Sequence, residues 1–134
     1  MAIGSYWADD YVLKKKSVQE AIGSIRSGQR IFIGSYCGEP QCLVRGLAEA
    51  APRFSNIEII RLMSHETTPL YLIANKTQDQ SLSIRSFYLG SASSGALARN
   101  MRFYTPVSMS AIPQLFTSRR IPLDVAMVQV SPPD

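Results

Sequence analysis

The chain has 134 residues, the length of a single domain, and its 46% hydrophobic and 18% charged residues exclude an intrinsically disordered protein. Its net charge of +4 fits either an ordinary solvated surface or an attraction to a phosphate-bearing ligand, whereas nucleic acid is disfavoured because the basic run at residues 14–16 has no interleaved aromatic residues. No apolar run approaches the ~18 residues of a membrane span, and residues 1–10 lack the features of a secretion signal, so we expect a cytoplasmic protein that makes no membrane contact.

The N-terminal part divides into an arm and the start of a folded domain. Residues 1–16 have no clear hydrophobic period, and we expect an arm that packs on something else, with an α/β domain over residues 17–134. Ser17 followed by Glu20 is a capping box, which predicts that a helix begins here. Gly28 is expected to end that helix, because glycine enters the left-handed conformation cheaply. The apolar residues at helical spacing are Val18, Ala21, Ile22 and Ile25.

A strand, a glycine turn and a helix follow in direct succession. Residues 30–33 are β-branched and aromatic, which predicts a strand, and the turn at residues 34–40 comes directly after it. Pro40 fits the first position of a helix, and Pro52 ends that helix because proline cannot sit in a helix interior. Residues 57–63 are nearly all apolar, which indicates a strand covered on both faces.

The rest of the chain continues the alternation. Further strands are predicted at residues 83–89, 102–107 and 123–130. The last of these is apolar enough to be a central strand, and Asp124 near its start has a structural role in this interpretation. Ser110 is an N-cap candidate for a helix that ends near residue 116. Weaker patterns indicate short helices at residues 70–74 and 96–100.

Alternating strands and helices predict an α/β fold, a doubly wound and mostly parallel open sheet with helices on both faces and right-handed crossovers. Ligands of such sheets bind beyond the carboxyl ends of the strands. The segments expected at that edge are residues 34–41, 64–68, 90–95 and 131–134.

The turn after the first strand is the strongest candidate site. Gly34 and Gly38, followed by a helix that starts near Pro40, predict backbone N–H groups at a helix N-terminus, which can hold a phosphate or a developing oxyanion. The spacing matches neither G-x-G-x-x-G nor the G-K-[ST] loop, which argues against dinucleotides and nucleoside triphosphates. Glu39 would repel a phosphate, which favours a carbonyl or thioester oxygen. A tight strand-to-helix connection without a ligand is the alternative.

Other reactive residues are few. His65 and Glu66 form the only adjacent acid–base pair, and they are either a general base in the cleft or ordinary surface residues. Cys37 and Cys42 have neither zinc-site nor CxxC spacing, and His65 cannot complete a metal set with them, so we expect free thiols and no metal. Cys37 could line a pocket, whereas Cys42 is expected in the core. Residue chemistry alone therefore indicates a binding turn without a convincing nucleophile.

Sequence blocks across the chain resemble the acetyl-CoA hydrolase/transferase family, which includes 4-hydroxybutyrate, acetate and succinate CoA-transferases. Residues 30–41, R-I-F-I-G-S-Y-C-G-E-P-Q, are similar to the family's first strand and glycine loop. Residues 103–116 are similar to its Y-T-P…S-x-I-P-x-L-F stretch. Residues 122–134 are similar to its P-x-D-V-A-x-x-Q-V-S-P-P-D signature. The resemblance runs in order from about residue 11 to the end.

The resemblance implies that this chain is the larger part of the first of two α/β domains, truncated at its C-terminal end and missing the second domain. The family transfers coenzyme A from an acyl-CoA to a small carboxylate through a glutamyl-CoA intermediate. The nucleophilic glutamate belongs to the second domain, so we expect no catalytic residue in this chain and no permanently bound cofactor. Acyl-CoA hydrolysis on the same fold and a non-catalytic ligand-binding fragment are the alternatives. We also expect a homo-oligomer.

The resemblance also implies which residues face the acyl-CoA cleft. In the family the glycine loop lies at the acyl and oxyanion side, and the end of the last signature faces the same cleft. His65 and Glu66 stand where the family often has a leucine-and-glycine stretch, and they are possible cleft residues. The residues expected to bind the acyl group or CoA are Gly34, Ser35, Cys37, Gly38, Pro40, Gln41, Gln129, Ser131 and Pro132.

Overall fold

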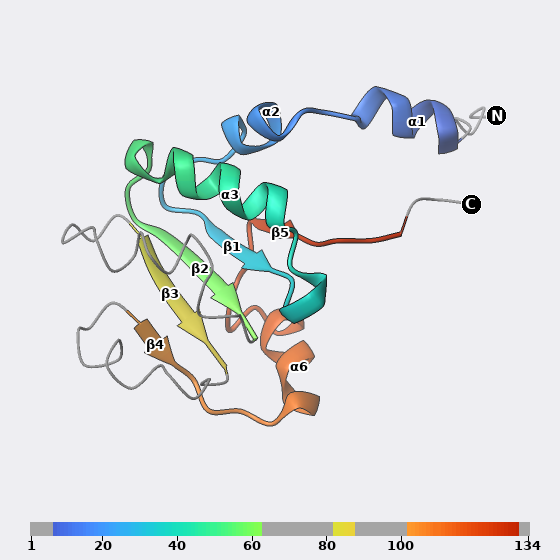
Figure 1. Cartoon of the computed structure of the whole chain (residues 1–134). Helices are drawn as coiled ribbons and strands as arrows, with labels where there is room; N and C mark the ends of the chain where they lie inside the picture. Colours follow the sequence, from blue (N-terminus) through green and yellow to red (C-terminus); the bar gives the residue numbers. More distant parts are fainter. Residues whose placement is uncertain (1–6, 63–81, 88–101, 132–134) are drawn as a thin grey trace.

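The computed structural model describes residues 7–62, 82–87 and 102–131 (Figure 1). Its helices are α1 (Trp7–Lys14), α2 (Val18–Gly23), α3 (Gln41–Ala50) and α6 (Ile112–Thr117). Its strands are β1 (Arg30–Ile33), β2 (Ile57–Arg61), β3 (Leu82–Ser86), β4 (Arg102–Tyr104) and β5 (Val125–Met127). Short 3₁₀ turns occupy Tyr36–Gly38, Ala51–Arg53 and Met109–Ala111.

The strands form one sheet in the order β4-β3-β2-β1-β5, and each of the four pairings is parallel. The chain adds β2, β3 and β4 on one side of β1 and then returns to the other side for β5. In register, Phe32 of β1 lies opposite Ile60 of β2 and Ala126 of β5. The predicted parallel, doubly wound α/β sheet is confirmed, and the reversal of strand order lies between β1 and β5.

The two faces of the sheet carry different helices. Ile31 and Ile33 of β1 belong to a buried cluster that includes Ile22 of α2 and Leu47 of α3. Phe32, between them in the strand, packs instead with Phe116 of α6, and the two rings meet edge to face at 5.8 Å between centroids. This alternation is what a strand of period two requires when both faces are covered. Helices on both faces are therefore confirmed.

The first helix begins as predicted but ends early. Both bonds of the capping box form: the Glu20 N–H donates to Ser17 Oγ at 3.2 Å, and the Ser17 N–H donates to a Glu20 carboxylate oxygen at 2.8 Å. The helix ends at Gly23, and the Ser24 hydroxyl donates to the Ala21 carbonyl at 2.7 Å. The prediction that Gly28 ends this helix is wrong. Gly28 has φ +83° in the turn before β1.

The last strand differs from its prediction in position and length. Within the described residues β5 pairs only with β1, so it lies at the edge of the sheet rather than at its centre. Only Met127 of this strand is buried, and Val128 and Val130 beyond it are 51% and 77% exposed. The structural role of Asp124 is confirmed, because its carboxylate accepts the Arg30 N–H at 2.7 Å.

The other predictions of local structure hold to within a few residues. Pro40 is the N-cap of α3 rather than its first residue, and α6 starts at Ile112 after a 3₁₀ turn that contains Ser110. The helices predicted at residues 70–74 and 96–100 lie outside the described residues.

Residues 7–14 of the predicted arm form α1, which has no buried residue and extends away from the sheet (Figure 1). None of the helices described is long and apolar enough to cross a membrane.

A charge cluster joins β1, β2 and β3 on the α6 side of the sheet. The Glu58 carboxylate accepts one hydrogen bond from Arg30 Nε and another from Arg85 Nε, each at 2.7 Å. Burial raises the pKa of Glu58, but the hydrogen bonds and charges of the two arginines outweigh it and hold the pKa below its usual value of 4.5. The ionised form is therefore the one that the folded state favours.

We predict that Glu58 makes stability fall in acid. Because its folded pKa is below its unfolded pKa, its contribution is complete above about pH 4.5 and is lost as the pH falls through the folded value. Glu58→Gln should lower the free energy of unfolding at pH 7 by about 1–2 kcal/mol, and it should flatten the acid limb of a plot of urea midpoint against pH. Glu49→Gln, at an exposed position on α3, is the control. Equal acid limbs for Glu58→Gln and the unchanged protein would contradict the prediction.

Candidate functional site

The reversal of strand order places the ends of β1 and β5 side by side. Directly after the paired residues Ile33 and Met127, the Gly34 N–H donates to the Met127 carbonyl at 2.9 Å. In open α/β sheets the crevice beyond the carboxyl ends of the strands at such a reversal is where ligands bind. The turn after β1 and the segment after β5 are therefore the two walls of the candidate site.

The turn after β1 is folded tightly on itself. A Cβ atom on Gly34 would lie 2.7 Å from the Gly38 carbonyl oxygen, so a larger residue does not fit without a shift of backbone. Tyr36, inside the turn, has φ +51°, a conformation that is uncommon for any residue other than glycine. Glycine at position 34 therefore allows the start of the turn to lie close to the Gly38 carbonyl at its end.

Three backbone N–H groups of this turn donate to carbonyls of the protein itself. The Gly38 N–H donates to the Ser35 carbonyl, and the Glu39 N–H donates to the Tyr36 carbonyl, each at 3.0 Å. Together with the bond from Gly34 to Met127, these bonds close the turn. The N–H groups left without an intrahelical acceptor are those at the start of α3, which precede the bond from the Val44 N–H to the Pro40 carbonyl at 3.0 Å. The predicted N–H groups at a helix N-terminus are therefore those of the first residues of α3.

Glu39 is part of the interior of this turn. Only 4% of the residue is exposed, and its carboxylate lies 3.4 Å from the side-chain amide nitrogen of Gln41, which donates to it. Gln41 itself is exposed at the first turn of α3. The Glu39 carboxylate is therefore held inside the turn, bonded to the Gln41 amide, rather than presented at the surface.

A hollow of about 370 Å³ lies where the start of α3 faces the segment after β5. It brings together three of the predicted site residues, Pro40, Gln41 and Gln129, from positions almost ninety residues apart. Gly34, Ser35, Cys37 and Gly38 form the neighbouring turn, with Cys37 and Gly38 exposed, and Ser131 is exposed at the end of the described chain. Pro132, His65 and Glu66 lie outside the described residues. A role in ligand binding stays a prediction for all of these residues.

Sequence reasoning missed the apolar part of the hollow. Its remaining lining residues are Cys42, Leu43, Val128 and Val130. The prediction of a core position for Cys42 is wrong, because the residue is exposed. The helical phase could have shown this, since Val44, Leu47 and Ala48 define the buried face and Cys42 lies outside that stripe. Within the described residues, no group of three or more His, Cys, Asp or Glu side chains could hold a metal ion.

Comparison with known proteins identifies the family. The sequence model of the acetyl-CoA hydrolase/transferase N-terminal domain matches residues 5–134. The chain belongs to this family. A 4-hydroxybutyrate coenzyme A transferase of Clostridium kluyveri is 25% identical over 128 residues, which are 96% of this chain and 29% of that protein. A succinyl-CoA:acetate/propanoyl-CoA:succinate CoA transferase of Fasciola hepatica is 30% identical over 115 residues, which are 86% of this chain and 23% of that protein.

Solved structures agree on the fold of this N-terminal domain. RipA from Yersinia pestis superposes with a TM-score of 0.78 at 23% identity, over 95% of this chain and 31% of that one. A 4-hydroxybutyrate CoA-transferase from Porphyromonas gingivalis superposes with a TM-score of 0.61 at 22% identity, over 96% of this chain and 28% of that one. The chain thus spans less than a third of the length of these relatives.

We predict that the two glycines of the turn differ in their tolerance of a side chain. Gly34→Ala places its Cβ against the Gly38 carbonyl and should lower the free energy of unfolding by about 1–3 kcal/mol. Gly38→Ala is the matched control, because a Cβ there meets nothing within 4 Å. Urea unfolding of both variants measures the difference. Equal losses, or a larger loss for Gly38→Ala, would show that the close approach of Gly34 to Gly38 does not limit this turn.

We also predict that both cysteines react with a thiol reagent in the folded domain. Cys37 and Cys42 are each exposed, so 5,5′-dithiobis(2-nitrobenzoic acid) should modify two thiols per chain without denaturant. Cys37→Ser should leave one fast thiol, and Cys42→Ser should do the same. A thiol that reacts only after addition of guanidinium would place its cysteine in the interior.

Proposed function

We propose that the protein to which this domain belongs transfers coenzyme A between an acyl-CoA and a small carboxylate. The observation that carries the proposal is the hollow at the reversal of strand order, in a chain that belongs to the acetyl-CoA hydrolase/transferase family. It brings together the start of α3 and Gln129, two segments that the resemblance to the family predicts at the cleft. The named transferases among the relatives support the choice of reaction.

The proposed reaction uses a glutamate that lies outside this chain. Its carboxylate attacks the thioester carbon, the C–S bond breaks, and an acyl-glutamyl anhydride and the CoA thiolate result. The thiolate then attacks the glutamyl carbonyl, which releases the first carboxylate and leaves a glutamyl-CoA thioester. The same two steps in reverse, with the acceptor carboxylate, produce the new acyl-CoA and regenerate the glutamate. These steps need no redox cofactor or metal, and coenzyme A takes part as a substrate.

This domain contributes the other wall of the cleft in the proposal. Negative charge develops on the carbonyl oxygen when the thioester is attacked, and hydrogen-bond donors aimed at that oxygen stabilise it. The donors at this edge are the first N–H groups of α3 and the side-chain amide of Gln41, at the positive end of the helix dipole. The glycine turn contributes indirectly, because its internal hydrogen bonds position Pro40 and the start of α3. The apolar residues Leu43 and Val128 suit the hydrocarbon part of an acyl group.

Hydrolysis of an acyl-CoA is the second candidate, because the family's description names hydrolase and transferase together. In that reaction water attacks the glutamyl intermediate in place of the acceptor carboxylate. The geometry of this domain does not distinguish the two, since both reactions need the same oxyanion donors. A non-catalytic ligand-binding role for the 134-residue chain by itself is compatible with either reaction in a longer polypeptide.

The test uses a polypeptide that contains this domain together with the remainder of the family fold. It is incubated with acetyl-CoA, with and without a small carboxylate such as butyrate, and the CoA products are separated. We predict new acyl-CoA only with the carboxylate present, with ping-pong kinetics. Release of free CoA at the same rate without a carboxylate would favour hydrolysis, and no turnover of any acyl-CoA tested would contradict both reactions.

We predict that Gln41→Ala lowers kcat/KM of that polypeptide by about ten- to a hundredfold, because one oxyanion donor is lost. Gln114→Ala is the matched control, because Gln114 is an exposed glutamine on α6, on the opposite face of the sheet. Urea midpoints of both variants report folding separately from activity. Unchanged kcat/KM in Gln41→Ala would remove Gln41 from the site while leaving the reaction itself open.

A further inference from the structure

A polar pocket lies on the α6 side of the sheet, at the amino-terminal end of its strands. Its volume is about 260 Å³, and its lining residues are Gly28, Arg30, Asn56, Glu58, Ser83 and Arg85. In register, Arg30 of β1 lies opposite Glu58 of β2, which lies opposite Ser83 of β3. Two residues further along β1 and β2, Phe32 and Ile60 pack with α6. The pocket therefore begins where the apolar cover of this face ends.

This pocket is separate from the hollow at the reversal of strand order. The hollow lies beyond the carboxyl ends of β1 and β5, whereas the pocket contains the first residue of β1 and the second residues of β2 and β3. Within the described part of the chain, the two share none of their lining residues. A ligand in the pocket therefore does not depend on the reaction proposed for the hollow.

The hydrogen bonds of the charge cluster leave donors that face this pocket. Glu58 accepts one N–H from each arginine, both through Nε at 2.7 Å. Arg85 also donates through Nη1 to the Thr105 hydroxyl at 3.2 Å. Among the described residues the Arg30 guanidinium bonds through Nε alone, which leaves the four N–H groups of its two terminal nitrogens. The Arg30 side chain is 43% exposed, so a ligand from solvent can reach these groups.

Asn56 adds donors from the turn before β2. Its φ of +56° is a left-handed conformation, which asparagine tolerates better than most residues. Its side chain is exposed and lines the same pocket as Arg30, and no hydrogen bond of its amide is formed within the described residues. The two N–H groups of this amide are therefore available beside the guanidinium of Arg30.

Charge and volume define the ligand that fits. The lining residues carry two positive charges and one negative charge, an excess of one positive charge. The Asp124 carboxylate, which accepts the backbone N–H of Arg30, is not among them. Attraction to one excess charge grows in proportion to the charge of the ligand, whereas the cost of removing the ligand from water grows with the square of its charge. A volume below the ~300–1,000 Å³ of sites for larger ligands also favours a small, singly charged group.

We propose that this pocket binds a carboxylate group, with its two oxygens bonded to the terminal N–H groups of Arg30 and to the side-chain amide of Asn56. The planar guanidinium matches the two oxygens of a carboxylate, and Arg85 adds positive charge on the other side of Glu58. A free small acid and an acidic side chain elsewhere in the longer polypeptide present the same group. The experiment is designed to distinguish these two sources.

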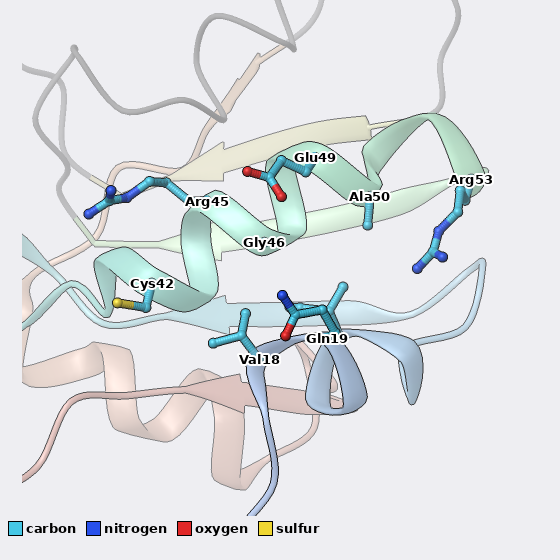
Figure 2. A pocket seen from close by; sticks show the side chains of 9 residues that line it. Val18, Gln19, Cys42, Arg45, Gly46, Glu49, Ala50 and Arg53 are labelled. Carbon is cyan, nitrogen blue, oxygen red and sulfur yellow. The ribbon is translucent and has the colours of Figure 1, made fainter.

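Modification of arginines by phenylglyoxal tests the site directly, because peptide mass spectrometry reports each arginine separately. We predict that acetate protects Arg30 saturably, with half of the protection at about 10 mM. Arg45 is the internal control, because it is exposed on α3, on the opposite face of the sheet, where it lines a groove between α2 and α3 (Figure 2). Sodium chloride at the same ionic strength controls for screening. Equal protection by chloride, equal protection of Arg45, or stronger protection by phosphate would overturn the proposal.

The source of the carboxylate follows from a comparison of this chain with the longer polypeptide of the activity test. Protection of Arg30 in the longer polypeptide without added acid, absent from this chain, identifies an acidic side chain of that polypeptide. Protection that needs added acetate in both proteins identifies a free acid. Arg30 that reacts equally fast in both proteins, with and without acetate, overturns the site.

Asn56→Gly separates a bound carboxylate from simple steric cover of Arg30. Glycine keeps the left-handed conformation accessible and removes the two amide donors, so protection should weaken about fivefold. Gln19→Ala is the matched control, because it removes an exposed amide that lines the groove on the opposite face (Figure 2). Urea midpoints of both variants report folding separately. Protection unchanged in Asn56→Gly, or weakened equally in Gln19→Ala, would contradict the proposed contacts.

Discussion

The pairing of β1 with β5 is the constraint on which the candidate site depends. These strands are separated by most of the domain in sequence, yet hydrogen bonds fix them at both ends. The Asp124 carboxylate accepts the Arg30 N–H at 2.7 Å at the start of the strands, and the Gly34 N–H donates to the Met127 carbonyl at 2.9 Å at their end. The reversal of strand order follows from this pairing. Without it, Gln129 and the start of α3 would have no reason to share a hollow.

The glycine turn supports the site in a different way from a phosphate loop. In a phosphate loop the glycine amides face the ligand. Here the N–H groups of Gly34, Gly38 and Glu39 are all bonded to carbonyls of the protein, and the contact that excludes a side chain at Gly34 is with the backbone of Gly38. In the proposed reaction the turn is therefore a support, and the helix that it positions supplies the donors. This arrangement suits a reaction whose transition state needs donors that do not move.

The sequence predicted the parts of the fold that depend on local chemistry. The Ser17–Glu20 capping box, the apolar run of β1 and the prolines around α3 each act within a few residues, so their patterns were sufficient. The position of β5 was beyond such reasoning, because an edge strand and a central strand can both be apolar. Val128 and Val130 are exposed at the carboxyl edge, where they line the hollow, and their hydrophobicity predicted a central strand. The prediction for Cys42 was wrong for a related reason, because a shift of one or two residues along a helix turns a side chain from the buried face to the surface.

Helix α3 takes part in two surfaces of the domain. Its N-terminal residues line the hollow, its outer side lines a groove between α2 and α3, and Cys42 borders both. The helix is packed against the sheet through Val44 and Leu47, neither of which is exposed. A displacement of α3 would therefore change the hollow and the groove together, because closely packed interiors transmit a shift of one element to its neighbours.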